Sequence, residues 1–121
     1  MRFMMIYKPA DTTDMEAGVP PTQEEIAKMG KFIEEMAKSG VLLATDGLQP
    51  SSKGARVRLS GGKLTVTDGP FTETKELIAG FAIGRVKSKA EAIELAGRFL
   101  KLAGDGESEI RLMHDTPAFV R

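Results

Sequence analysis

The chain has 121 residues, 41% hydrophobic and 28% charged, which is an ordinary globular composition for a single domain over residues 1–121. Its 17 cationic and 17 acidic side chains give zero formal charge, which argues against a nucleic-acid or membrane-surface partner. With no cysteine and one histidine, disulfides, thiol catalysis and thiolate or multi-histidine metal sites are excluded, so we expect no metal and no cofactor. The N-terminal apolar run ends after Tyr7, too early for a signal segment or a membrane span, and this favours a cytoplasmic protein.

The first predicted element is a strand over Arg2–Lys8, which Pro9 ends. Side chains alternate along a strand, so one face carries Met4 and Ile6 and the other carries Phe3, Met5 and Tyr7. Both faces are therefore apolar. Residues Pro9–Pro21 show no usable period and predict a loop of about a dozen residues.

A helix is predicted over Thr22–Ser39. Thr22 and Glu25 have the spacing of a capping box at its start. Apolar residues then recur at i, i+3 and i+4 as one stripe, and Gly40 ends the helix.

Short strands follow this helix. Val41–Ala44 predicts a strand that ends at Asp46-Gly47, and the residues 49–54 (QPSSKG) form a polar connection. Ala55–Leu59 and Lys63–Thr67 flank Ser60-Gly61-Gly62 and predict a β-hairpin. Because one face of the hairpin is apolar and the other polar, we expect it near the edge of the sheet.

A further strand is predicted over Leu77–Val86. Gly80, Ala82 and Gly84 share one of its faces, which indicates close approach by another backbone, expected to be a helix. Phe81, Ile83 and Arg85 occupy the opposite face.

Ser88 and Glu91 repeat the capping-box spacing at the start of a second helix that Gly104 ends, and Ser108–Met113 is the last predicted strand. With the inserted hairpin set aside, the order βαββαβ is that of an α+β, ferredoxin-like domain with two helices on one face of an antiparallel sheet. The uncovered face would also be apolar, so we expect a homodimer joined through the open sheet face.

The segment Asp68–Glu76, DGPFTETKE, stands out from ordinary turn sequences. Asp68, Gly69 and Pro70 are typical turn residues: Gly allows positive φ, and Pro fixes the next φ. We expect an architectural turn in which the following Phe71 is buried.

On these residues the sequence resembles the YCII-related family, in its DGPF-domain branch, which is named for the residues that here are Asp68, Gly69, Pro70 and Phe71. The extended pattern continues with Glu73, Lys75, Glu76 and Gly80. Gly40, the step Asp46-Gly47-Leu48, Glu109 and Arg111 support it, so the resemblance runs from Phe3 to Arg111. It implies a ferredoxin-like dimeric α/β barrel.

The resemblance implies less about activity. Some relatives are found beside or joined to sigma factors, whereas other members look enzyme-like, with a proposed catalytic histidine early in the first helix. Thr22–Ser39 contains no histidine, so that acid–base role does not carry over to this chain. Whether the protein is an enzyme stays open.

Each candidate site residue has a structural and a functional interpretation. Asp68 caps its own turn, or is a pocket carboxylate. Glu73, Lys75 and Glu76 form a solvated rim, or Lys75 binds an anionic group. Arg111 lies mid-strand, where it either pairs with Glu73 or Glu76 across the sheet or clamps a carboxylate ligand.

Two further candidates lie near strand ends. His114 is the only side chain whose ordinary pKa is near neutrality, and an exposed or interface role is favoured over a catalytic one. Tyr7 is a core or dimer-face aromatic residue, or it lines the same cavity as Phe71. Ser51 and Ser52 have no basic partner at a spacing that suggests a nucleophile.

Two functions from different classes follow. The first is a small dimeric α+β protein that binds a small polar or aromatic ligand, with catalysis left open and the DGPF residues in the wall of the cleft. The alternative is a non-enzymatic regulatory accessory protein that acts through protein contacts with a sigma factor.

Overall fold

The computed structural model describes residues 1–72 and 76–115. The described elements are β1 (Arg2–Pro9), α1 (Thr13–Glu16), α2 (Gln23–Lys38), β2 (Leu42–Gly47), a 3-10 turn (Ser51–Lys53), β3 (Ala55–Ser60), β4 (Lys63–Asp68), β5 (Gly80–Arg85), α3 (Lys89–Ala103) and β6 (Gly106–Leu112). The α+β class is confirmed, and the element order is compatible with a ferredoxin-like fold.

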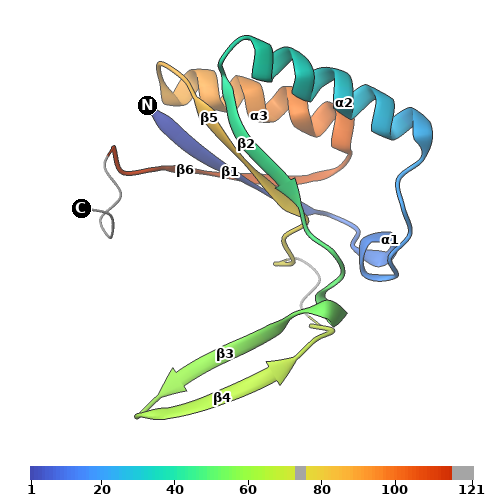
Figure 1. Ribbon diagram of the computed structural model, residues 1–121, viewed down its shortest axis with the longest axis vertical. Helices are drawn as coiled ribbons and strands as arrows, with labels where there is room; N and C mark the ends of the chain where they lie inside the picture. Colours follow the sequence, from blue (N-terminus) through green and yellow to red (C-terminus); the bar gives the residue numbers. More distant parts are fainter. Residues whose placement is uncertain (73–75, 116–121) are drawn as a thin grey trace.

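Four strands form the main sheet in the order β2-β5-β1-β6, and every neighbouring pair is antiparallel. The two central strands, β1 and β5, are each flanked by a strand on both sides. Helices α2 and α3 lie side by side over one face of this sheet (Figure 1). The other face carries no helix among the described residues.

Helices α2 and α3 cover one of the two apolar faces of β1. Phe3 and Met5 are buried against α3, where they meet Ala92 and Leu95, and Met36 of α2 packs against the same core. Tyr7 shares this face. Met4 and Ile6 lie opposite Ile83 and Phe81 of β5 on the open face of the sheet. The sequence alone did not indicate which of these two faces of β1 is covered by the helices.

Both long helices start where their capping residues predict. At α2 the Thr22 side chain accepts from the Glu25 amide (3.1 Å) and the Glu25 carboxylate accepts from the Thr22 amide (3.0 Å), which confirms the capping box. At α3 only half of the box forms. Ser88 accepts from the Glu91 amide, but the Glu91 carboxylate accepts from the Lys87 amide instead.

Several elements differ in their bounds from the sequence prediction; β2, for example, runs to Gly47 rather than to Ala44. The segment Pro9–Pro21 is not all loop, because it holds the four-residue helix α1. β5 begins at Gly80 rather than at Leu77, although Leu77 itself is buried. The sequence did not reveal α1, because a helix of four residues is too short to show a period.

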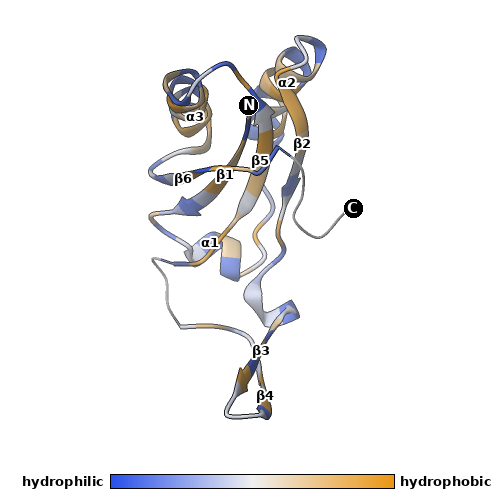
Figure 2. Cartoon of the chain, turned by 90° about the vertical axis from the view of Figure 1, so that its left-hand side faces the viewer, coloured by the Kyte–Doolittle hydropathy of each residue, from blue (hydrophilic) through white to orange (hydrophobic). Residues whose placement is uncertain are grey.

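The hairpin was predicted near the edge of the main sheet, and this is wrong: β3 and β4 form a separate two-stranded sheet. In both views the hairpin and the helices α2 and α3 lie at opposite ends of the longest axis (Figures 1 and 2). Alternation alone does not distinguish a half-covered strand from one that is exposed on both faces, so the pattern could not reveal this separation.

Candidate functional site

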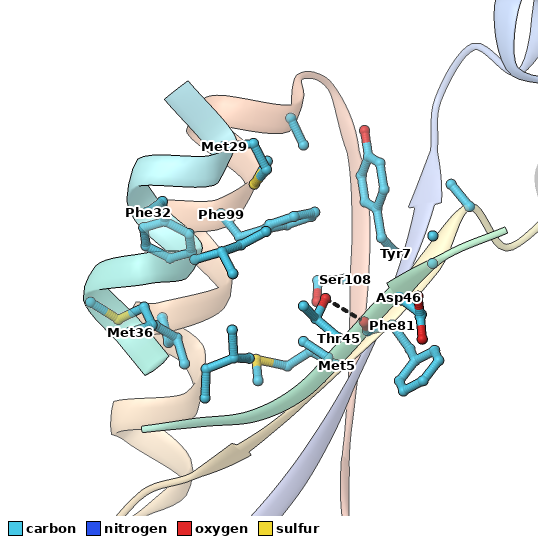
Figure 3. A pocket seen from close by; sticks show the side chains of 18 residues that line it. Met5, Tyr7, Met29, Phe32, Met36, Thr45, Asp46, Phe81, Phe99 and Ser108 are labelled. Atoms are coloured by element: carbon cyan, nitrogen blue, oxygen red, sulfur yellow. Dashed lines mark hydrogen bonds between the residues drawn. The ribbon is translucent and has the colours of Figure 1, made fainter. Parts of the chain in front are cut away.

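A cavity of about 480 Å³ lies between the helix layer and the main sheet. Side chains from β1, α2, β2, β5, α3 and β6 line it (Figure 3). The apolar and aromatic residues in its wall include Met5, Tyr7, Met29, Phe32, Ile33, Met36, Leu42, Leu95, Phe99 and Ala103.

Small residues on the helix-facing side of the sheet create this space. One row across the four strands reads Gly47, Gly80, Tyr7 and Ser108, because each of these residues is the register partner of the next. Two of the four positions have no side chain and a third has only a hydroxymethyl group. The sheet therefore leaves empty space on both sides of the Tyr7 ring.

The small-residue face of β5 was predicted to admit another backbone, expected to be a helix. The backbone that comes closest is that of β2, at Gly80, and α3 approaches Gly84 through a side chain. A Cβ at Gly84 would lie 3.5 Å from the Leu95 side chain of α3 and 3.0 Å from Met5. At Gly80 a Cβ would instead lie 2.7 Å from the Asp46 carbonyl oxygen of β2, and the helix side is open. The same run of small residues thus admits a helix at Gly84 and leaves a cavity at Gly80.

Tyr7 is the candidate site residue that lines the cavity. Its ring meets Phe99 of α3 edge to face, with centroids 5.2 Å apart and planes inclined by 80°. Its hydroxyl donates over long distances, 3.4 Å and 3.5 Å, to the carbonyl oxygens of Gly104 and Asp105. Burial, and then the negative charge of Asp105, raise the pKa of the Tyr7 phenol, so the hydroxyl stays neutral and able to donate.

Two other hydroxyl groups belong to the cavity wall. Thr45 donates to the Phe81 carbonyl oxygen at 2.9 Å, so its proton is already engaged. Ser108 lies beside Tyr7 in the same row. Asp46 and Phe81 border the cavity, but Figure 3 shows their side chains turned away from the helices. The polar chemistry inside is therefore that of neutral hydroxyl groups.

The DGPF turn lies at the base of the hairpin and does not contribute to the cavity wall. The Gly69 amide donates to the Gly54 carbonyl oxygen at 3.0 Å, and the Phe71 amide donates to the Ser51 hydroxyl oxygen at 2.9 Å. Phe71 was expected to be buried, but it is half-buried, with the Arg56 guanidinium 3.9 Å above its ring centroid. Its packing partner is a long cation rather than the core.

Sequence reasoning dismissed Ser51, yet the structure places it at the centre of this region. Its hydroxyl and its amide both donate to the Glu16 carboxylate, and these two hydrogen bonds lower the pKa of Glu16. Glu16 is 35 residues away in sequence, so no local pattern pointed to the pair. The contact joins α1 to the DGPF turn.

The remaining candidates lie on or beside the open face of the sheet. Arg111 donates to Glu109 at 3.1 Å, on its own strand, and not to Glu76 as one interpretation had it. Lys8 binds both Glu109 (3.0 Å) and Glu76 (3.3 Å), and these hydrogen bonds raise the pKa of Lys8. The Lys8 and Arg111 cations together lower the pKa of Glu109.

Two described candidates, Asp68 and His114, stay apart from these groups. Asp68 ends β4 and is exposed. His114 is exposed, and its carbonyl oxygen accepts from the Arg2 guanidinium at 2.7 Å. Glu73 and Lys75 lie outside the described residues. Within residues 1–72 and 76–115, no group of three or more potential metal ligands is found.

A family model described as the YCII-related domain matches residues 1–111. A curated relative from Rhizobium meliloti (strain 1021), "Uncharacterized protein R00369", is 38% identical over 66 residues, which is 54% of this chain and 50% of the relative. The chain therefore spans about half the length of that relative. Among the described helices, none is long and apolar enough to cross a membrane.

Proposed function

The chain belongs to the YCII-related family, and on that premise we propose that it binds a small aromatic molecule in the cavity between α2, α3 and the main sheet. The observation that carries this proposal is the cavity itself, about 480 Å³ in volume and walled by apolar and aromatic side chains. Ligand sites in proteins typically enclose about 300–1,000 Å³ and combine an apolar wall with a few polar groups. Both features are present.

The wall favours an aromatic ligand over an aliphatic one. Phe32, Phe99 and Tyr7 come from three different elements and border the same space. Aromatic rings gain from edge-to-face contact beyond the area that they bury. Tyr7 and Phe99 already adopt this arrangement with each other, so a third ring would extend an existing cluster.

One polar substituent on the ligand would find a partner near Tyr7. The hydrogen bonds of the Tyr7 hydroxyl are 3.4 Å and 3.5 Å long, well above the usual distance for a strong hydrogen bond. Exchanging them for a shorter bond to a ligand oxygen costs little. Among the described residues that border the cavity there is no Lys, Arg, Glu or His, so a neutral phenol fits better than a carboxylate.

Thermal denaturation with and without p-cresol tests the proposal, with benzoate as a charged probe of similar size. We expect p-cresol to raise the melting temperature more than benzoate does. Ala103→Leu adds a larger side chain to the cavity wall and should abolish the p-cresol effect. Ala27→Leu makes the same change on the exposed side of α2 and should preserve it. Equal responses of both variants to p-cresol would contradict this site.

We also propose that two copies associate through the open face of the main sheet. The central positions of that face are occupied by Met4, Ile6, Phe81 and Ile83, which share it by their register. An apolar sheet face of this kind favours coverage by a partner. Catalysis, the DGPF assignment, the cytoplasmic location and the sigma-factor alternative remain predictions from the sequence.

A further inference from the structure

We propose that the hairpin β3–β4 is an arm that packs its apolar face onto a second copy of this chain. This inference rests on the homodimer proposed above and extends it. The arm adds an interaction surface that lies outside the main sheet and outside the cavity.

The hairpin presents an apolar face that its own chain leaves exposed. Val57 lies opposite Val66, and Leu59 lies opposite Leu64, so the four side chains form one ladder. Each of them is 65–67% exposed. A two-stranded hairpin by itself is at best marginally stable in water, and it gains stability when a further layer covers its apolar face. The ladder therefore needs a partner.

The two ends of the hairpin are held together at its base. The Gly69 amide binds the Gly54 carbonyl oxygen across the two ends of the hairpin, at 3.0 Å. On the polar face, Arg56 lies over the Phe71 ring of its own chain. Val57 and Val66 belong to the opposite face, because neighbouring residues of a strand alternate. The polar face thus contacts its own chain at the base, and the apolar ladder is left for another molecule.

Charge favours a copy of this chain as that molecule. Residues 53–68 contain four cationic side chains and one carboxylate, Asp68. Because the whole chain has 17 of each sign, the remainder carries 13 cationic and 16 acidic side chains. A cationic arm and an acidic body attract each other between two copies of a chain that is neutral overall.

The small size of the open sheet face also favours a contribution of the hairpin to the dimer interface. The open sheet face offers about a dozen outward side chains, since only alternate residues of its four strands point to it. A stable interface takes roughly 20–30 residues from each partner. The hairpin extends on the side of the sheet away from α2 and α3 (Figure 1), so a copy that covers the open face lies beside the arm. The arm supplies contacts that the sheet face lacks.

The test compares dimer dissociation constants, measured by sedimentation, for the full chain and two variants. Leu59→Glu combined with Leu64→Glu places charges on the ladder and should raise the dissociation constant by about 100-fold or more. Ile93→Glu makes the same kind of change at an exposed aliphatic side chain of α3, 54% exposed, and should leave it unchanged. An unchanged constant in the double variant overturns the arm, even if the unmodified chain is dimeric.

Amide hydrogen exchange of the unmodified protein provides a second readout that requires no variant. We expect amides of residues 55–68 to be protected above the dimer dissociation constant and to exchange faster on dilution below it. Fast exchange at every concentration overturns the arm. A monomer at all concentrations overturns the arm and the homodimer together, whereas the p-cresol experiment tests the cavity separately.

Discussion

Gly69 lies so close to the backbone of Ser51 that a side chain at position 69 would overlap the Ser51 carbonyl oxygen. The φ angle of Gly69 is not positive, so this glycine is needed for packing and not, as the sequence suggested, for a left-handed turn. Ser51 in turn holds the Phe71 amide and the Glu16 carboxylate. One glycine thus lets the DGPF turn, the 3-10 turn and α1 meet.

Replacing Gly69 with alanine should destabilise the protein by about 1–3 kcal/mol or more, because backbone must move to accept the methyl group. Urea unfolding measures this loss. Gly30→Ala is the matched control: Gly30 lies within α2, and a Cβ there meets nothing within 4 Å. That change should stabilise the protein by about 0.5–1 kcal/mol through helix propensity. A neutral Gly69→Ala variant would refute the packing argument.

The Glu16–Ser51 contact predicts a pH-dependent contribution to stability. The folded-state pKa of Glu16 is lowered, so its contribution is present above the unfolded pKa, about 4.3, and is lost as the pH falls through the folded value. Glu16→Gln should therefore reduce the free energy of unfolding near neutral pH but make little difference in acid. Urea unfolding of both proteins at several pH values measures the gap. A gap that stays constant down to low pH would rule out the ionised contact.

Phe71→Ala should cost roughly half of the 3–5 kcal/mol that a fully buried phenylalanine loses, about 1.5–2.5 kcal/mol, because Phe71 is half-buried. Phe71→Leu keeps most of the apolar volume and removes the ring beneath Arg56, so about 0.5–1 kcal/mol should be lost. Urea unfolding distinguishes the two variants. Equal losses would mean that the contact with Arg56 provides nearly all of the stabilisation.

Patterns that repeat within a few residues predicted the fold well. The capping residue Thr22, the apolar stripe that follows it and the alternation in β1 each depend on local spacing, and each was confirmed. The α+β class followed from their order. The separation of the hairpin from the main sheet depends on tertiary packing, which alternation within β3 and β4 does not encode.

The site was harder to predict because a cavity forms where large side chains are absent. Gly80 was recognised as part of a small-residue face, but small residues admit either a helix or an empty space. Tyr7 was named as a possible cavity residue and lies in the wall, yet its neighbour there is Phe99 and not Phe71. Phe99 is 92 positions further along the chain, and its role in the helix stripe gave no sign of the contact.

Tyr7 is the only tyrosine and the chain has no tryptophan, so absorbance titration of the phenol measures this one residue. We expect its pKa above the ordinary value of about 10, because burial and the Asp105 charge disfavour the phenolate. Since the folded pKa is raised, the associated stability is present below the unfolded pKa and is lost as the pH rises through the folded one. Asp105→Asn should lower the pKa part of the way, with burial keeping the rest. A pKa at or below that of a free tyrosine would contradict the half-buried position of the ring.

Phe81→Asp tests the open sheet face. Phe81 pairs with Ile6 in register, and its side chain points away from the helices (Figure 3), so the substitution leaves the core of the monomer in place. In a dimer joined through this face, two carboxylates would be brought into an apolar interface, and their desolvation should raise the dissociation constant by at least 100-fold. Sedimentation gives the mass, and far-ultraviolet circular dichroism establishes that the variant is folded. Ile93→Asp, on the exposed side of α3, should remain dimeric. A folded Phe81→Asp variant that dimerises as tightly as the unmodified protein would place the interface elsewhere.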